Sequence, residues 1–378
     1  MSVWESLVGQ RRVVETLDRA ARGDGMTHAW LFTGPPGSGR SNAALAFAAA
    51  LQCERAGCGE CEGCRTALAG SHPDVLVTAT ERSVLTVDLA RELVLKSALK
   101  PVRGRWHVMI VEDADRLNDQ ANNALLKAIE EPAARTVWML CAPHVDDVLP
   151  TIRSRSRTIR LATPSVEDVT DFLVSRHDVA PALAAHAARA SQGHIGRARA
   201  LATDEETRRR RREVITLPAR LRGLGDCMGA AADIVELAKQ DSESTNERFR
   251  VQGMTAIDAV YGDDRRSRAS RSGKAAVKQL DDEVKARKKR AVNDTVDRVL
   301  MDLVSVYRDV IVLQQGAAVG LVNDDVRNDL EEFARRTSPE DNLRRIGAIY
   351  EAREQMLEFN TPPLLALESL MLSLMVHA

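Results

Sequence analysis

Aromatic residues make up only 3% of the 378 residues. So few aromatic side chains disfavour a platform on which the bases of single-stranded nucleic acid would stack. An excess of one charge is also missing, because 53 basic and 54 acidic residues leave a formal net charge of −1. Without an overall basic field, any contact with nucleic acid is expected to be local or to be made within an assembly.

Long apolar runs are lacking as well. No segment reaches the roughly 18 uninterrupted apolar residues that a membrane span needs, and the apolar stretch 364–376 is interrupted by Glu368 and Ser373. The N-terminus, Met1 to Glu5, has neither the basic nor the apolar region of a secretory signal. We therefore expect a cytoplasmic protein with no membrane partner, whose six cysteines are thiols or metal ligands before they are disulfides.

The first 160 residues alternate short apolar runs with helical patterns, and this alternation predicts an α/β domain with a parallel sheet and helices on both faces. One of these helices is expected from Asn118 to Glu131, where Pro132 ends it. The length suits two or three domains, and 44% hydrophobic residues suffice for their cores. The expected strands are Ala29–Thr33, Asp74–Val77, His107–Val111, Thr136–Leu140 and Thr158–Leu161.

After Pro164 the pattern becomes helical throughout. Residues 165–201 suit a small three-helix unit, and apolar residues at helical spacing fill 292–311. The basic run Arg208 to Arg212 is interpreted as a solvated helix face or a domain junction rather than a phosphate-binding patch. The polar segment 262–290 is expected to be a mobile loop that leads into a long charged helix.

A phosphate-binding loop is predicted at residues 34–41, between the first expected strand and an Ala-rich helix. The alternative is a Gly/Pro-rich turn that only caps this helix. Arginine stands where the motif has lysine, and a planar guanidinium fits less well beneath the β- and γ-phosphates than a compact ammonium group. The serine hydroxyl that would bind Mg²⁺ is kept, so binding of ATP and Mg²⁺ remains open. The candidate nucleotide-binding residues are Gly34, Gly37, Gly39, Arg40 and Ser41.

Carboxylates follow the expected strand His107–Val111, where an ATPase of this class has an Asp that organises Mg²⁺ and then a Glu that activates water. Here the order is inverted, with Glu112 before Asp113. Because proton transfer depends on hydrogen-bond reach, the exchange is expected to depress hydrolysis. Alternatively, or in addition, Asp113 and Asp115 cap a helix that begins near Ala114.

Four of the six cysteines lie within twelve residues, in the pattern C-x4-C-x2-C-x2-C. Four thiolates at this spacing, with glycines between them for tight turns, form a closed tetrahedral site, which is typical of structural Zn²⁺. An iron–sulfur cluster and incidental free thiols are the alternatives. Cys141 and Cys227 are isolated and are expected in the core. The candidate metal ligands are Cys53, Cys58, Cys61 and Cys64.

These motifs occur in an order that resembles the AAA+ subunits of bacterial DNA polymerase III clamp loaders, among them the gamma/tau and delta' types. The phosphate loop and the cysteines are followed by the segments 112–117, 123–132 and 149–155, and the likeness returns at 360–370. The resemblance implies a P-loop AAA+ domain over 1–162 with a zinc module at 53–64. It further implies a three-helix lid over 163–205 and a helical collar domain for oligomerisation over 206–378.

Within this family, Ser154 and Arg155 match the motif whose arginine reaches the ATP of a neighbouring subunit as an arginine finger. Such a guanidinium neutralises charge that develops on the γ-phosphoryl group, so hydrolysis depends on assembly. Without the resemblance, an ordinary surface salt bridge would be the favoured reading of Arg155.

Four features needed for turnover depart from the family pattern, whereas the arginine that acts on a neighbour is kept. This asymmetry favours a delta'-like, stator-like subunit that hydrolyses little ATP itself. The implied partners are gamma/tau and delta subunits and, through the complex, the sliding clamp and primer–template DNA in the replisome. The alternatives are an ATP-hydrolysing gamma/tau-type motor and a zinc-dependent module that reads DNA sequence. The altered features are Arg40, the Glu112–Asp113 order, Ala142–Pro143 in the sensor position, and Arg197 one residue late after Gly193.

Overall fold

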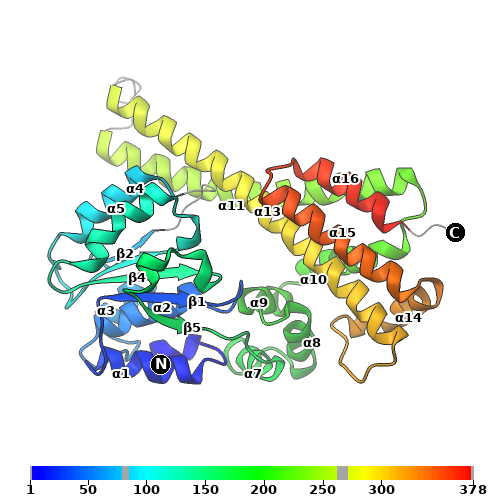
Figure 1. Cartoon of the computed structure of the whole chain (residues 1–378), viewed down its shortest axis with the longest axis horizontal. Helices are drawn as coiled ribbons and strands as arrows, with labels where there is room; N and C mark the ends of the chain where they lie inside the picture. The colour runs from blue at the N-terminus through cyan, green and yellow to red at the C-terminus, as the bar shows by residue number, and fades with distance from the viewer. Residues whose placement is uncertain (1, 79–84, 262–270, 376–378) are drawn as a thin grey trace. The chain divides into compact units, whose positions relative to one another are not determined.

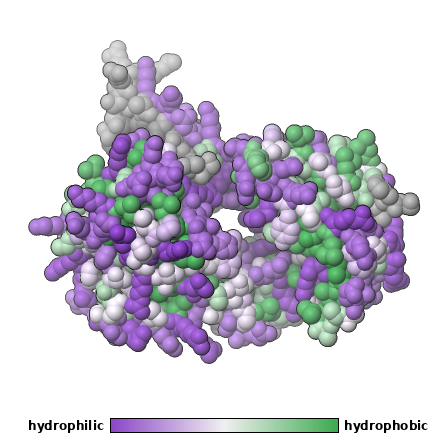
Figure 2. All heavy atoms as spheres, in the orientation of Figure 1, coloured by the Kyte–Doolittle hydropathy of each residue, from purple (hydrophilic) through white to green (hydrophobic). Residues whose placement is uncertain are grey.

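The computed structural model describes residues 2–78, 85–261 and 271–375. The chain divides into two compact units, Met1–Thr203 and Asp204–Ala378. Figure 2 shows hydrophilic residues over much of the visible surface of each unit. None of the helices in the described ranges combines the length and the apolar composition that crossing a membrane requires.

The first unit contains a five-stranded parallel sheet in the order β2-β3-β4-β1-β5 (Figure 1). Leu31 of the central strand β1 lies opposite Leu140 of β4 on one side and Thr158 of β5 on the other. The sequence prediction of five strands is confirmed, with ends displaced by no more than two residues. The strands are β1 (Ala29–Thr33), β2 (Val75–Thr78), β3 (His107–Val111), β4 (Thr136–Ala142) and β5 (Arg157–Arg160).

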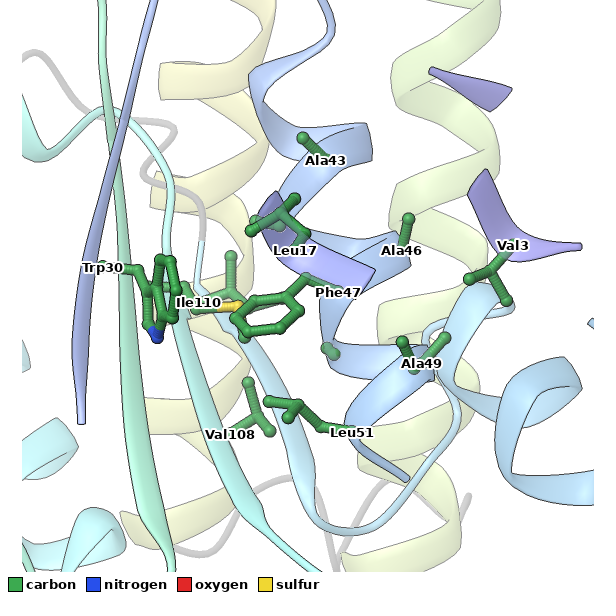
Figure 3. Packing of buried hydrophobic residues seen from close by; sticks show 14 of the residues in the cluster. Val3, Leu17, Trp30, Ala43, Ala46, Phe47, Ala49, Leu51, Val108 and Ile110 are labelled. Carbon is green, nitrogen blue, oxygen red and sulfur yellow. The ribbon is translucent and has the colours of Figure 1, made fainter. Parts of the chain in front are cut away.

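Helices cover both faces of this sheet, as predicted. Alternate strand residues point to opposite faces, and every residue of β1, β3 and β4 is buried, so both faces need a covering layer. On one face Trp30, Phe32 and Ile110 pack with the Ala-rich helix α2, and Figure 3 shows Phe47 of α2 beside Trp30. On the other face Leu31 and Trp138 belong to a second core. The first face is covered by α1 (Arg11–Ala21), α2 (Arg40–Leu51) and α3 (Glu62–Leu68), and the second by α4 (Val87–Ser97), α5 (Asp119–Glu130) and α6 (Pro150–Arg153).

Three further helices complete the first unit and have a small core of their own, which includes Val169, Leu173, Ala187 and Leu201. Short 3-10 helices occur in the connections. The three helices are α7 (Val166–His177), α8 (Pro181–Ser191) and α9 (Ile195–Thr203), and the 3-10 helices are η1 (Val3–Ser6), η2 (Ala114–Arg116) and η3 (Val145–Asp147).

The described part of the second unit is helical, as expected, and contains no strand. Its core surrounds Tyr307, which is fully buried and meets Phe333 edge to face. Of the polar segment 262–290, residues 262–270 lie outside the described ranges and 271–290 form the first part of α13. The helices are α10 (Glu205–Ile215), η4 (Leu217–Ala219), α11 (Leu224–Tyr261), α13 (Arg271–Gln314), η5 (Asp324–Val326), α14 (Arg327–Arg336), α15 (Pro339–Leu357) and α16 (Pro363–Leu374).

The basic run on α10 is only partly the solvated face that the sequence suggested. Arg209 is exposed and pairs with Glu206 and Glu213 along the helix. Arg211, by contrast, is buried, and its Nε atom donates to Asp302 at 3.1 Å. The expectation was wrong for Arg211 because it lies one turn before the buried Val214 and Ile215, on the inward face of α10.

Candidate functional site

The predicted phosphate loop joins the carboxyl end of β1 to the start of α2. Its glycines adopt conformations that side chains rarely permit, with φ of +81° at Gly37 and +91° at Gly39, which precedes α2. Arg40 and Ser41 are the first two residues of α2. Backbone N–H groups at such a helix start can bind an anion, helped by the helix dipole. The loop therefore has the location that a phosphate site in a parallel α/β sheet requires.

Arg40 bonds to the loop itself. Its Nη1 atom donates to the carbonyl oxygen of Gly34 at 2.9 Å, and the Gly34 N–H in turn donates to Pro143 at 3.1 Å. In this conformation the guanidinium holds the two ends of the loop together. A lysine has only one nitrogen at the end of a flexible stem, so the arginine replacement gives this loop a support of different geometry.

The start of α9 packs on the same loop. A β-carbon at residue 37 would lie only 2.3 Å from Cγ of His194, so the imidazole is in direct contact with Gly37. The N–H of Ile195 also donates to the Gly37 carbonyl at 3.4 Å. The His194 ring is held by its Nδ1 atom, which accepts from the Arg197 N–H at 3.2 Å. His194 was not singled out from the sequence, and the only signal there was its place in the lid segment 193–196.

Glu112 and Asp113 directly follow β3, and both side chains are partly buried. Because parallel strands end at the same edge of a sheet, they lie on the edge that also carries the phosphate loop. Asp113 has φ of +52° and precedes η2, but its side chain makes no capping hydrogen bond. Burial, and then the charge of Asp113, raise the pKa of Asp115. This edge therefore holds three neighbouring carboxyl groups, of which Asp115 has a raised pKa.

The four clustered cysteines converge as the sequence predicted, and their sulfur atoms all lie within 4.8 Å of one another. Sγ of Cys53 is 3.6 Å from Sγ of Cys58. Four sulfurs around a tetrahedral Zn²⁺ would be about 3.8 Å apart, given Zn–S bonds of about 2.3 Å. The donor set and its spacing therefore fit a metal ion such as zinc. Cys141 and Cys227 are buried core residues, as expected.

Backbone and side-chain donors favour a thiolate at Cys58, whereas burial raises the pKa of the Cys61 and Cys64 thiols. The N–H groups of Glu60 and Cys61 lower the pKa of the Cys58 thiol to about 6. Arg55 adds a positive charge, with Nη2 at 3.2 Å from Sγ of Cys58. Sγ of Cys61 accepts from the N–H of Cys64 at 3.4 Å and caps α3. Thiolates are the form that binds a metal, so metal binding here would displace protons from the Cys61 and Cys64 thiols.

The cysteine loop is tied to the rest of the first unit on two sides. The Val3 N–H donates to the carbonyl of Gly57 at 3.0 Å, so η1 holds one end of the loop. At the other side, Oε1 of Gln52 accepts from Arg105 N–H at 2.9 Å and Nε2 of Gln52 donates to Trp106 at 2.6 Å. These bonds link the loop to the segment that leads into β3. A metal ion here would thus stabilise the first unit as a whole and not only the cysteine loop.

Arg155 lies in the turn between α6 and β5. Its backbone N–H donates to Ile152 at 3.1 Å, and its side chain forms an ion pair with Glu130 at 2.5 Å between Nε and Oε1. The Arg155 side chain is 40% exposed. Glu130 was not singled out from the sequence, although it stands in the 123–132 segment that carried the family resemblance.

The phosphate loop and Arg155 lie at opposite ends of neighbouring strands. β5 runs parallel to β1, and Arg157 at its start pairs with Trp30 at the start of β1. Gly34 follows the far end of β1, four residues of extended chain later, or about 13 Å. Arg155 therefore extends from the edge of the sheet that is remote from its own phosphate loop.

Known sequences agree with these features. The family described as "DNA polymerase III, delta subunit" matches residues 9–165, and "DNA polymerase III, delta subunit, C terminal" matches residues 291–375. The two matches together span more than half of the chain. The chain belongs to the DNA polymerase III delta' family. The Pseudomonas aeruginosa delta' subunit is 40% identical over 134 residues, which are 34% of this chain and 41% of that protein.

Other relatives extend the same picture. The Escherichia coli delta' subunit is 36% identical over 180 residues, which are 46% of this chain and 54% of that protein. The gamma/tau subunit of Mycobacterium tuberculosis is 36% identical over 156 residues, covering 40% of this chain and 27% of that protein. The chain thus spans about half or less of the length of these relatives. Similarity to both subunit types means that identity alone does not separate a delta' role from a motor role.

Proposed function

We propose that the chain acts as the delta' subunit of a clamp loader that places a sliding clamp on primer–template DNA. In this role it assembles with gamma/tau and delta subunits and supplies Arg155 to the ATP site of an adjacent gamma/tau subunit. Its own phosphate loop contributes little hydrolysis. The zinc module and the helical second unit give it a stable frame within the complex.

The position of Arg155 carries this proposal. A half-exposed guanidinium at the sheet edge remote from its own phosphate loop cannot serve that loop, but it is accessible to a second subunit. A guanidinium supplied in trans stabilises negative charge on the transferred phosphoryl group, an effect worth about 10³–10⁵ in kcat in related systems. The same side chain would be of no use to this subunit's own nucleotide.

The chain's own nucleotide site supports a minor catalytic role. Arg40 bonds to Gly34 within the loop, and His194 packs on Gly37. The inverted carboxylates, Glu112 and Asp113, place the longer side chain where a metal ligand is needed and the shorter one where a base is needed. Each of these features works against a correctly placed Mg²⁺–triphosphate.

The four-cysteine site is proposed to hold one structural Zn²⁺. The four sulfurs leave no position open for water or substrate, so the metal would have no catalytic task. The Gly57 carbonyl accepts from Val3 in η1, and the Gln52 side chain donates to Trp106, directly before β3. Zinc would therefore stabilise the first unit.

The decisive experiment compares ATP hydrolysis by the complex, reconstituted from this chain and its own gamma/tau and delta subunits, with and without Arg155→Ala. We expect a loss of at least about tenfold in kcat, since removal of a trans arginine costs at least that much. Arg153→Ala is the matched control, because Arg153 ends α6, two residues before Arg155, and pairs with Asp146 instead. Equal activity of Arg155→Ala and unmodified complex would contradict the proposal.

A gamma/tau-type motor is the second candidate, favoured by the 36% identity to such a subunit. Hydrolysis by the purified chain, abolished by Ser41→Ala and independent of partners, would support it. The delta' role predicts negligible turnover by the chain alone. A titration with a fluorescent ATP analogue separates weak binding from slow chemistry at the same loop.

A further inference from the structure

Glu130 and Arg155 form an ion pair between two elements that are distant in sequence. Oε1 of Glu130, the last residue of α5, lies 2.5 Å from Nε of Arg155 in the turn before β5. The two side chains are 41% and 40% exposed. The pair is therefore accessible to a partner surface and is not part of the buried core.

Two hydrogen bonds hold the same guanidinium in addition to the ion pair. Its Nη1 atom donates to the carbonyl oxygen of Thr151 at 2.8 Å and to Oγ of Ser154 at 3.1 Å. Together with the Glu130 contact, these bonds engage the Nε and Nη1 sides of the group. The Nη2 donors take no part in the ion pair or the two hydrogen bonds, so they are available to an acceptor outside this cluster.

Rigid elements support both members of the pair. Ile129, next to Glu130, and Ile152, three residues before Arg155, are fully buried in the core beneath α5 and α6. The N–H of Arg155 donates to Ile152 at 3.1 Å, which fixes the backbone of the turn. Both the backbone and the guanidinium of Arg155 are thus held by elements that belong to one core.

We infer that Glu130 is a positioning residue, which holds Arg155 in the orientation that reaches a neighbouring subunit's ATP. This inference rests on the trans role proposed above for Arg155. A free arginine side chain loses rotamer entropy when it becomes fixed on a ligand. The Glu130 contact fixes much of that side chain before the neighbour arrives, so less entropy is lost at the step where the phosphoryl group is transferred.

Two substitutions at residue 130 test the contact in different ways. A glutamine at residue 130 keeps a carbonyl oxygen that accepts from Nε of Arg155, whereas alanine removes it. Half-exposed ion pairs are weak, so the expected effect of alanine is modest: about a two- to fivefold loss of kcat at the neighbouring site. The KM for ATP should not change, because positioning of this group acts on the transition state.

The test measures ATP hydrolysis by the reconstituted complex with Glu130→Ala, Glu130→Gln and Arg155→Ala, singly and combined. We expect Glu130→Ala to lower kcat, Glu130→Gln to retain most of it, and Glu130→Ala to have no further effect in the Arg155→Ala background. Asp146→Ala is the matched control. It frees Arg153 from an ion pair of the same 2.5 Å length in the neighbouring loop and should leave kcat unchanged.

Different results would separate the two proposals. If Arg155→Ala lowers kcat but Glu130→Ala leaves it unchanged or raises it, the positioning role falls and the trans role of Arg155 stands. An equal loss in Glu130→Gln and Glu130→Ala, or a further loss in the Arg155→Ala background, also overturns positioning through Arg155. If Arg155→Ala has no effect, both proposals fail.

Discussion

The carboxylate of Asp74 and the backbone of Gly104 are joined by a hydrogen bond of 2.6 Å, donated by the Gly104 N–H to Oδ2. The N–H groups of Val102 and Arg103 donate to the same carboxylate at 2.6 and 2.8 Å. Asp74 itself is almost fully buried, immediately before β2. One buried side chain thus holds the loop that leads toward β3.

We expect Asp74→Asn to destabilise the first unit in a pH-dependent way. Burial alone would raise the pKa of Asp74, but the three N–H donors together lower it below its usual value. The carboxylate therefore stabilises the fold above its unfolded pKa of about 3.9, and this contribution is lost as the pH falls through the lower folded value. At pH near 7 the substitution should cost about 1–2 kcal/mol of the free energy of unfolding.

Urea unfolding followed by tryptophan fluorescence measures this loss, because Trp4, Trp30, Trp106 and Trp138 all lie in the first unit. The difference from the unmodified chain should shrink below about pH 4. Asp88→Asn, an exposed position on α4, is the control. A difference that stays constant from neutral to strongly acidic pH would refute the carboxylate's role.

Gly37→Ala is expected to destabilise the first unit more than an alanine at another left-handed glycine. Both Gly37 (φ +81°) and Gly23 (φ +98°) would incur the strain of that conformation, about 1–3 kcal/mol. Only at Gly37 would the new methyl group also collide with His194, whereas nothing lies within 4 Å at Gly23. The same fluorescence experiment compares the two variants. Adding His194→Ala should recover the excess loss at Gly37, and failure to do so would contradict the contact.

Arg211→Ala should destabilise the second unit by roughly 3–5 kcal/mol, because it removes the arginine from a buried ion pair with Asp302. Arg212→Ala removes the adjacent, exposed arginine of the same helix and should change stability by no more than about 0.5 kcal/mol. Calorimetry of the whole chain resolves this comparison, with the tryptophan signal as a monitor of the first unit. Similar losses in the two variants would mean that the buried pair does not stabilise the second unit.

Metal analysis should find about one zinc per chain, and Cys58→Ser should abolish it while Cys141→Ser does not. A strong chelator should lower the unfolding midpoint of the first unit, since the cysteine loop is bonded to Val3. Because protons compete with the metal for the thiolates, and burial raises the pKa of Cys61 and Cys64, metal affinity should fall steadily as the pH is lowered. Visible absorbance from iron in place of zinc would favour the iron–sulfur alternative.

The sequence was sufficient for the sheet and the cysteine cluster because both are local patterns. Short apolar runs such as His107–Val111 bury every residue, and four cysteines so close in sequence can converge without help from distant segments. The phosphate loop was located for the same reason. Each of these features is complete within a few consecutive residues.

Side-chain partners from distant segments could not be predicted in this way. His194 meets Gly37 only because α9 returns to the loop after β1, and Glu130 meets Arg155 only because α5 and α6 share a core. The five arginines of α10 look alike in sequence, yet burial of Arg211 depends on Asp302, 91 residues further on. Periodicity predicts which face of a helix points inward, but not which side chain from a distant segment that face will contact.

Parallel strands also give the first unit a polarity. The candidate phosphate loop lies at the carboxyl end of β1, and the turn at the amino end of β5 carries Arg155. When such domains associate head to tail, the amino edge of one meets the carboxyl edge of the next. In the proposed complex, Arg155 would therefore face the carboxyl edge of the adjacent subunit, and the direction of β1 and β5 would set the direction in which arginines are supplied.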